Sequence, residues 1–238
     1  MTLMKDISYV GATPANHRPH QYVYNKLQDI VWDQVLAKYF LYPKLLDVVE
    51  NFTGPNIMAM HSMLINKPPD AGTLSSTHPL HQDLHYFAFR PADWIVAAWT
   101  AMERIDEENG CLKVIPGTHK GHLLPHEYPE MGGIYNKAFF EAKGYVGDKK
   151  PIPVIMDKGD TVFFHPLLIH GSGPNLSKRF RKAISCHYAA SECYYVDIRG
   201  TSQQNAIDEI TDGAKRRGIL LDMEVKLRNS FCIRALIT

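Results

Sequence analysis

The sequence carries a pair of metal-binding residue types, His81-x-Asp83, followed much later by His170 and then by Arg181. Two imidazoles and one carboxylate form the 2-His-1-carboxylate facial triad, which holds Fe(II) on one face and leaves the other face open for an oxidant and a co-substrate. The arginine adds a permanent positive charge that suits a dicarboxylate. These four residues predict a non-heme iron oxygenase.

The surroundings of the pair matter, because a chain with 12 histidines produces His-x-Asp pairs by chance and a lone histidine is more often a core or surface residue. We expect an extended strand from His81 to Phe87. Alternate side chains of a strand share a face, so His81, Asp83, His85 and Phe87 would point to one side. His81 and Asp83 could then bind one ion.

His170 and Arg181 lie in a β-rich part of the chain. His170 ends a short apolar run that follows a turn at Pro166, and two glycines come soon after it. Arg181 stands near the start of the next strand-like segment. A histidine at a strand end and an arginine entering the next strand are expected at the same mouth of a small β-barrel.

The remaining elements follow from hydrophobic spacing. Apolar residues at steps of three and four predict a helix over 22–40, Pro43 suits the first turn of a second helix over 44–51, and 203–217 is helical and amphipathic. Two long connections, 67–79 and 116–151, are typical of functional loops. Many strands with long loops at one end predict a mainly β fold with flanking helices, a jelly roll or cupin-like barrel with the site at its mouth. The strand-like segments are 57–65, 94–102, 111–115, 152–156, 161–164 and 182–189.

Composition and missing motifs exclude several classes. The net charge of +1 gives no general attraction to nucleic acid or a membrane surface, and no apolar run approaches the roughly 18 residues of a membrane span. The four cysteines lack Cys-x-x-Cys spacing, which argues against a zinc knuckle or a disulfide framework and favours a reducing compartment. There is no His-Glu-x-x-His, Gly-x-Ser-x-Gly or P-loop motif. Other histidine pairs are interpreted as loop or strand residues, namely His78/His81, His81/His85 and His122/His126.

Several long stretches resemble the phytanoyl-CoA dioxygenase family of the Fe(II)/2-oxoglutarate superfamily, over about residues 26–204. The stretches that carry the resemblance are 52–61, 78–87, 98–103, 116–121 and 158–173. A match of this density is far more specific than the triad alone. It implies a double-stranded β-helix.

The resemblance also implies roles for individual residues. His81, Asp83 and His170 resemble the iron ligands of the family, Arg181 resembles the arginine that pairs with the distal carboxylate of 2-oxoglutarate, and Ser172 resembles its hydroxyl helper. Three further positions match the lining of the 2-oxoglutarate pocket: Lys26, Met63 and Trp99. From the residues alone, Met63 and Trp99 are equally well explained as core residues on strands.

The implied reaction is hydroxylation at C2 of a 3-methyl-branched fatty acyl-CoA such as phytanoyl-CoA, the first step of fatty-acid alpha-oxidation. The implied cofactors are Fe(II), 2-oxoglutarate as co-substrate with dioxygen, and ascorbate as reductant. The carboxylate of Asp83 favours hydroxylation over halogenation, which needs a vacancy for halide. Coenzyme A phosphates are expected at a lysine-bearing loop, and Phe139 and Phe140 either face the branched chain or pin this loop. The lysines are Lys120, Lys137, Lys143, Lys149 and Lys150.

We interpret the chain as one dioxygenase domain over 1–238, with N-terminal helices at about 22–51, a barrel core at about 57–190 and a C-terminal helix at about 203–217. Compared with the family that it resembles, we expect this domain to be without the N-terminal extension. The resemblance implies a peroxisomal protein, yet no import signal is visible, so a genuine short form would be cytoplasmic. Two alternatives remain open: a dioxygenase of the same fold that hydroxylates another small substrate, and a truncated, catalytically silent acyl-CoA-binding relative.

Overall fold

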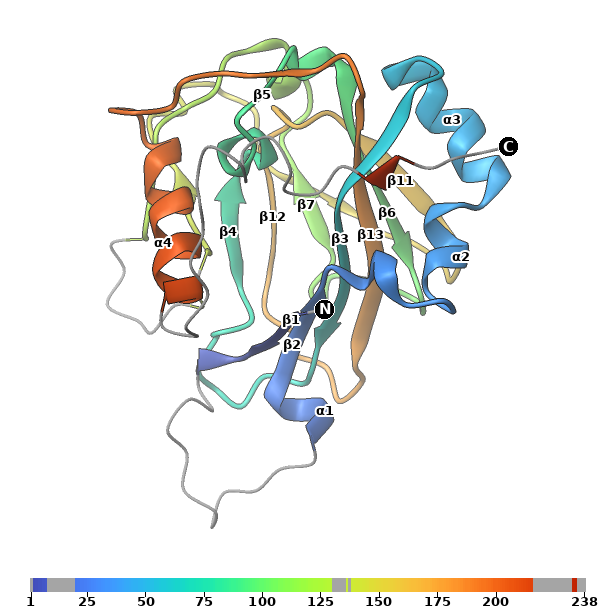
Figure 1. Ribbon diagram of the computed structural model, residues 1–238. Helices are drawn as coiled ribbons and strands as arrows, with labels where there is room; N and C mark the ends of the chain where they lie inside the picture. Colours follow the sequence, from blue (N-terminus) through green and yellow to red (C-terminus); the bar gives the residue numbers. More distant parts are fainter. Residues whose placement is uncertain (1, 8–19, 130–135, 137, 216–232, 235–238) are drawn as a thin grey trace.

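Two antiparallel sheets face each other in the computed structural model, which describes residues 2–7, 20–129, 136, 138–215 and 233–234 (Figure 1). The larger sheet has the strand order β1-β2-β3-β13-β6-β11, and β15 (Ile233–Arg234) also pairs with β3. The bounds of its main strands are Thr2–Lys5 (β1), Tyr24–Gln28 (β2), Ile57–Lys67 (β3), Arg181–Ala190 (β13), Ile95–Ala101 (β6) and Thr161–Phe164 (β11).

The smaller sheet carries two of the three predicted metal ligands. Its strand order is β10-β7-β12-β4. The bounds are Ile152–Val154 (β10), Leu112–Val114 (β7), His170–Ser172 (β12) and His78–His81 (β4). Two short pairs complete the described β structure: β5 (Phe89–Arg90) with β14 (Tyr194–Tyr195), and β8 (His126–Glu127) with β9 (Glu141–Ala142).

The central strands of the larger sheet are buried on both faces. In β6, Val96 and Ala98 pack on one side in a cluster with helix α3, whereas Ala97 and Trp99 face the smaller sheet together with Leu112 of β7. This alternation follows from the two-residue period of a strand. The inner face of the larger sheet therefore forms one wall of the space between the sheets.

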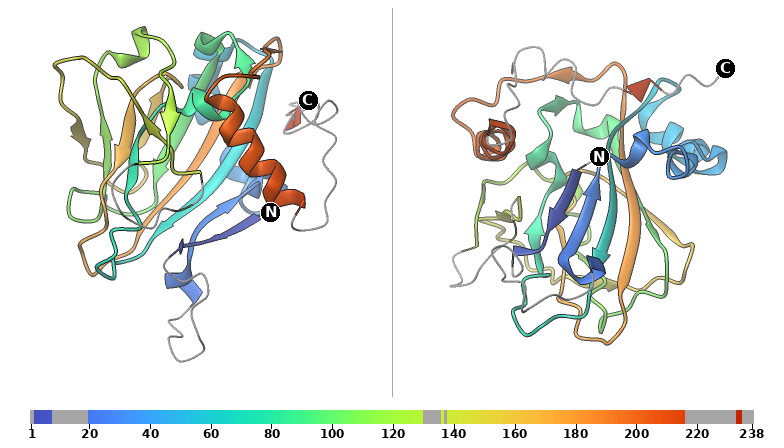
Figure 2. Two further views of the ribbon diagram at one scale, coloured as in Figure 1. Left: turned by 90° about the vertical axis from the view of Figure 1, so that its left-hand side faces the viewer. Right: turned by 60° about the horizontal axis from the view of Figure 1, so that its bottom comes forward.

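Helices cover the outside of this sandwich. α3 (Pro43–Thr53) begins with a proline in its first turn and buries Leu45, Leu46 and Val49 against the larger sheet. The short helices α1 (His20–Val23) and α2 (Ala37–Phe40) precede it. α4 (Gln203–Lys215) lies on the opposite side of the molecule and contacts the 3-10 helix η4 (Asp83–Tyr86) (Figure 2).

The predicted mainly β, cupin-like fold is confirmed, and the expected strands 57–65, 94–102, 161–164 and 182–189 agree with the structure within two residues at each end. The helix expected over 22–40 is wrong, because residues 24–28 form strand β2 between β1 and β3. The strand expected from 81 to 87 is also wrong, since the chain turns into η4 at Asp83.

Some predictions fall outside the described residues, namely those on Lys137, Cys232 and the end of the C-terminal helix at 216–217. Within the described part of the chain, no helix is long and apolar enough to cross a membrane.

Candidate metal centre and co-substrate pocket

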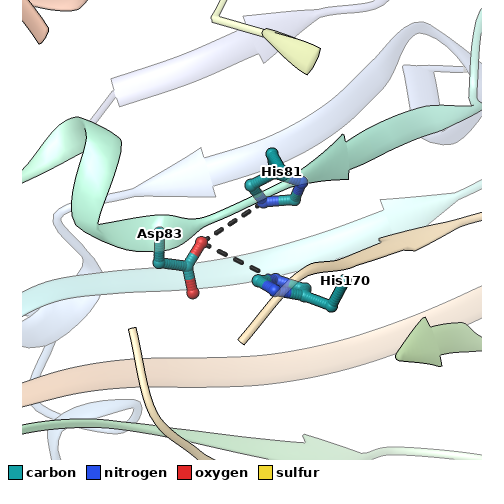
Figure 3. Close-up of side chains that lie close together, drawn as sticks. All are labelled: His81, Asp83 and His170. Atoms are coloured by element: carbon teal, nitrogen blue, oxygen red, sulfur yellow. Dashed lines mark ion pairs between the residues drawn. The ribbon is translucent and has the colours of Figure 1, made fainter. Parts of the chain in front are cut away.

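His81 and His170 are brought together by the pairing of β4 with β12, in which they are direct partners (Figure 3). Gly171 of β12 packs directly against the backbone of β4. A Cβ atom at Gly171 would lie 2.7 Å from the carbonyl oxygen of His78 and 2.9 Å from that of Pro79. Glycine is required here because any side chain would push the two histidine-bearing strands apart.

Asp83 reaches the histidines because the chain turns directly after β4. The backbone N–H of Gln82 donates to Nε2 of His126 at 2.9 Å, and its side-chain amide donates to the carbonyl oxygens of His122 and Leu167. These bonds anchor Gln82 in the interior, and Asp83 then opens η4 with its carboxylate directed at the two imidazoles.

The three side chains present their acceptor atoms to a common point. Nδ1 of His81 lies 2.8 Å from the carbonyl oxygen of Pro79, and Nδ1 of His170 lies 2.9 Å from that of Leu168. A carbonyl oxygen can only accept, so each Nδ1 carries the proton and each Nε2 offers a lone pair. Oδ1 of Asp83 lies 3.3 Å and 3.6 Å from these two Nε2 atoms.

Three acceptors that face one another repel unless a cation lies among them, so the donor set fits a divalent metal ion. The ligand atoms all lie within 4.8 Å of one another, and the three residues are buried. Burial lowers the pKa of His170 to about 4, which keeps its imidazole neutral and able to bind a metal at physiological pH. Two nitrogens and one carboxylate oxygen match the ligand set of non-heme Fe(II).

A fourth buried side chain, His187 of β13, contacts the triad. Its Nε2 lies 2.8 Å from Oδ2 of Asp83, and because a carboxylate oxygen accepts, His187 donates. Burial alone would raise the pKa of Asp83, but His170 and the hydrogen-bonding His187 hold that pKa well below its usual range. Asp83 is thus kept ionised, with Oδ1 directed at the histidines.

The alternative histidine pairs do not form a second metal centre in the described part of the chain, where the triad is the single such cluster. His78 stacks on His81, with ring centroids 4.0 Å apart, and on Phe139 at 4.2 Å. His85 stacks on His126 at 4.3 Å. These rings surround the triad instead of forming separate sites.

A pocket extends from the triad to a group of cations, and every site residue expected from the sequence lines it. Arg181, which is 2% exposed, lies over the Trp99 ring at 5.4 Å and donates from Nη2 to the carbonyl oxygen of Gly110. Its Nε atom is buried without a hydrogen-bond partner among the described residues. The remaining expected residues in the lining are Lys26, Met63 and Ser172.

His187 and Lys67 are among the pocket residues that reasoning from the sequence missed. His187 shares the inner face of β13 with Arg181 and Ser185, so the two-residue period of the predicted strand was the signal that could have indicated it. Lys67 lies opposite Arg181 in the pairing of β13 with β3. No spacing in the sequence indicates this cross-strand relationship.

Solved structures of low sequence identity share the fold of this chain. The epimerase SnoN from nogalamycin biosynthesis, in complex with Fe3+ and alpha-ketoglutarate, aligns over 72% of this chain and 65% of its own with a TM-score of 0.59 and 19% identity. The non-heme monooxygenase ThoJ aligns over 82% of this chain and 75% of its own with a TM-score of 0.58 and 19% identity. The fold is that of the non-heme iron, 2-oxoglutarate-dependent enzymes.

The sequence comparison is more specific. The model of the family described as "Phytanoyl-CoA dioxygenase (PhyH)" matches residues 7–183. The chain therefore belongs to the phytanoyl-CoA dioxygenase family, as the motifs predicted.

Two relatives show how far the similarity extends. The human peroxisomal phytanoyl-CoA dioxygenase is 51% identical over 235 residues, which are 99% of this chain and 68% of the human protein. The peroxisomal phytanoyl-CoA dioxygenase of Rattus norvegicus is 54% identical over 217 residues, 91% of this chain and 63% of the rat protein. The chain thus spans about two thirds of the length of these relatives.

Proposed function

We propose that the protein hydroxylates C2 of a 3-methyl-branched fatty acyl-CoA such as phytanoyl-CoA, using Fe(II), 2-oxoglutarate and dioxygen. The observation that carries the proposal is one pocket that joins His81, Asp83 and His170 to the buried guanidinium of Arg181. This pocket pairs a metal-binding end with an anion-binding end. The identity to phytanoyl-CoA dioxygenases supports the choice of substrate.

Three residues of the chain hold the metal: His81 and His170 through Nε2, and Asp83 through Oδ1. When bound, Fe(II) supplies the activation of dioxygen that converts 2-oxoglutarate to succinate and CO2 and places one oxygen atom on the substrate. The second oxygen atom enters succinate, so atoms and electrons balance without a further reductant in each turnover. Ascorbate acts as the reductant that maintains Fe(II).

Arg181 and Ser172 bind the distal carboxylate of 2-oxoglutarate, because a guanidinium offers two parallel N–H donors to a carboxylate. Lys26 adds a second positive charge at the pocket. Met63 and Trp99 form apolar walls that orient the carbon chain and exclude water. Removal of water strengthens the electrostatic attraction between the cations and the doubly charged ligand.

Exposed lysines are available to the phosphates of coenzyme A. Lys120, Lys149 and Lys150 are exposed and therefore accessible to a phosphate, whereas Lys143 is paired with Glu141 at 2.7 Å. We infer that the exposed lysines contact the phosphates. Phe139 and Phe140 are buried, which supports a role in pinning the loop. The relatives named as peroxisomal support a peroxisomal location.

The experiment compares three acyl substrates with the purified protein, Fe(II), 2-oxoglutarate and ascorbate: phytanoyl-CoA, free phytanic acid and palmitoyl-CoA. Mass spectrometry measures the hydroxylated products. We expect a 2-hydroxy product from phytanoyl-CoA alone. Hydroxylation of a different small molecule would support the alternative of another substrate, and binding of phytanoyl-CoA without any product would support the silent relative.

A further inference from the structure

Lys67 is a buried lysine that lines the pocket beside Arg181. It is the last residue of β3, it pairs directly with Arg181 of β13, and both side chains line the pocket. Lys67 is 5% exposed, and within the described residues neither it nor Arg181 forms an ion pair with a carboxylate. Burying two adjacent cations without an anion costs free energy, and a bound anion offsets that cost.

The ammonium group of Lys67 makes two hydrogen bonds to the segment that follows His170. Nζ donates to Oγ of Ser172 at 2.8 Å and to the carbonyl oxygen of Gly173 at 2.5 Å. Because Ser172 accepts from Lys67, its own hydroxyl hydrogen points elsewhere, and no described residue accepts it. Lys67 therefore prepares Ser172 to donate to a ligand in the pocket.

The distance between His170 and Ser172 matches the length of a short dicarboxylate. Ser172 and His170 are two residues apart on β12, so they share one face and lie about 7 Å apart along the strand. A five-carbon 2-oxo diacid whose keto end lies at His170 brings its far carboxylate to Ser172, Arg181 and Lys67. A monocarboxylate of the same length would leave these cations without a partner.

The electrostatics agree with this arrangement. Burial, and then the charges of Arg181 and Lys26, lower the pKa of Lys67 well below its usual value. A carboxylate beside Nζ acts in the opposite direction and favours the charged form.

We propose that Lys67 is a positioning residue for the 2-oxo acid: it holds Ser172 as a donor to the distal carboxylate and thereby sets the preference for a dicarboxylate over a monocarboxylate. This inference rests on the proposed function, since it takes 2-oxoglutarate as the co-substrate.

The test measures ligand binding to the Fe(II)-loaded protein without oxygen, by isothermal titration calorimetry. The ligands are 2-oxoglutarate and 2-oxovalerate, which has the same chain length and lacks the distal carboxylate. We expect Lys67→Met to weaken 2-oxoglutarate binding by about 10- to 100-fold and to leave 2-oxovalerate binding unchanged. Lys182→Met, a lysine of β13 that does not line the pocket, is the matched control and should bind both ligands like the wild type.

A double variant tests whether Lys67 acts through the serine. In a Ser172→Ala background, Lys67→Met should have little further effect on 2-oxoglutarate binding. An equal loss of 2-oxoglutarate affinity on Lys67→Met with and without Ser172 would overturn the positioning role. An equal loss of affinity for both ligands, together with a lowered melting temperature, would indicate a structural role and would also overturn it. If the wild type itself does not prefer 2-oxoglutarate to 2-oxovalerate, the proposed function fails. If the wild type shows this preference and Lys67→Met shows it undiminished, the proposed function stands and the role of Lys67 is refuted.

Discussion

His187 donates a hydrogen bond from Nε2 to Oδ2 of Asp83 across 2.8 Å, in the interior between the two sheets. This bond occupies one oxygen of the carboxylate and leaves Oδ1 facing His81 and His170. It therefore favours a carboxylate that binds a metal through a single oxygen. Hydrogen bonds to ligand carboxylates commonly tune metal affinity in this way.

Replacing His187 by phenylalanine removes this donor and retains an aromatic ring against His61 and Phe87. We expect metal affinity to fall by about 10- to 100-fold, measured by titration with Mn(II). His61→Phe is the control, because it alters the same stack without touching Asp83. A similar loss of affinity in both variants would mean that packing, and not the hydrogen bond, orients the carboxylate.

Gly171 is predicted to be necessary for the close pairing of β4 with β12. In Gly171→Ala the new Cβ meets the carbonyl oxygens of His78 and Pro79, so we expect a loss of about 1–3 kcal/mol in the free energy of unfolding and weaker metal binding. Denaturant unfolding measures the first effect. Gly173→Ala is the control, since a Cβ there meets nothing within 4 Å; equal destabilisation by the two variants would contradict the steric argument.

The affinity for 2-oxoglutarate should decrease as pH rises through about 8. Burial lowers the pKa of Lys26 to about 8, the charge of Asp83 opposes this shift, and that of Arg181 adds to it. Lys26 is charged below this pH and neutral above it, while the ligand keeps both negative charges. Between about pH 7 and pH 9 we expect a decrease of up to about tenfold.

Calorimetric titrations at several pH values check this dependence. Lys26→Arg should remove it, because a guanidinium stays charged throughout the range. A wild-type affinity that does not change with pH would show that the charge of Lys26 does not contribute to binding.

A metal ion should stabilise the folded protein through the triad. At a concentration of about 100 times its Kd, Mn(II) should add about 2.7 kcal/mol and raise the melting temperature by roughly 5–10 °C. Differential scanning fluorimetry measures the shift. Asp83→Ala should abolish it, and a shift that persists in this variant would place the metal elsewhere.

Local patterns predicted part of the fold well. Residues 161–164 and 182–189 are rich in residues that favour strands, and both segments are strands. The apolar spacing of residues 22–40 wrongly predicted a single helix. A half-buried strand followed by short helical turns can show the same spacing. Pairing of β2 with residues 2–5 and with β3 decides its structure, and such long-range pairing leaves no local signal.

The sequence predicted which residues form the site better than it predicted how they are arranged. His81 and Asp83 converge, but through a turn at Gln82 and not along one strand, because contacts from distant loops anchor that residue. Lys67 and His187 enter the pocket through the register of β3, β13 and β6, which no single stretch of sequence contains.

The most direct test of the account is the stoichiometry of turnover. Wild-type protein and Asp83→Ala are incubated with Fe(II), ascorbate, 2-oxoglutarate and phytanoyl-CoA, and succinate and 2-hydroxyphytanoyl-CoA are quantified. We expect equal amounts of both products from the wild type and neither product from the variant. Failure of folded, iron-loaded wild-type protein to form the hydroxylated thioester, or an unchanged yield from Asp83→Ala, would contradict the account.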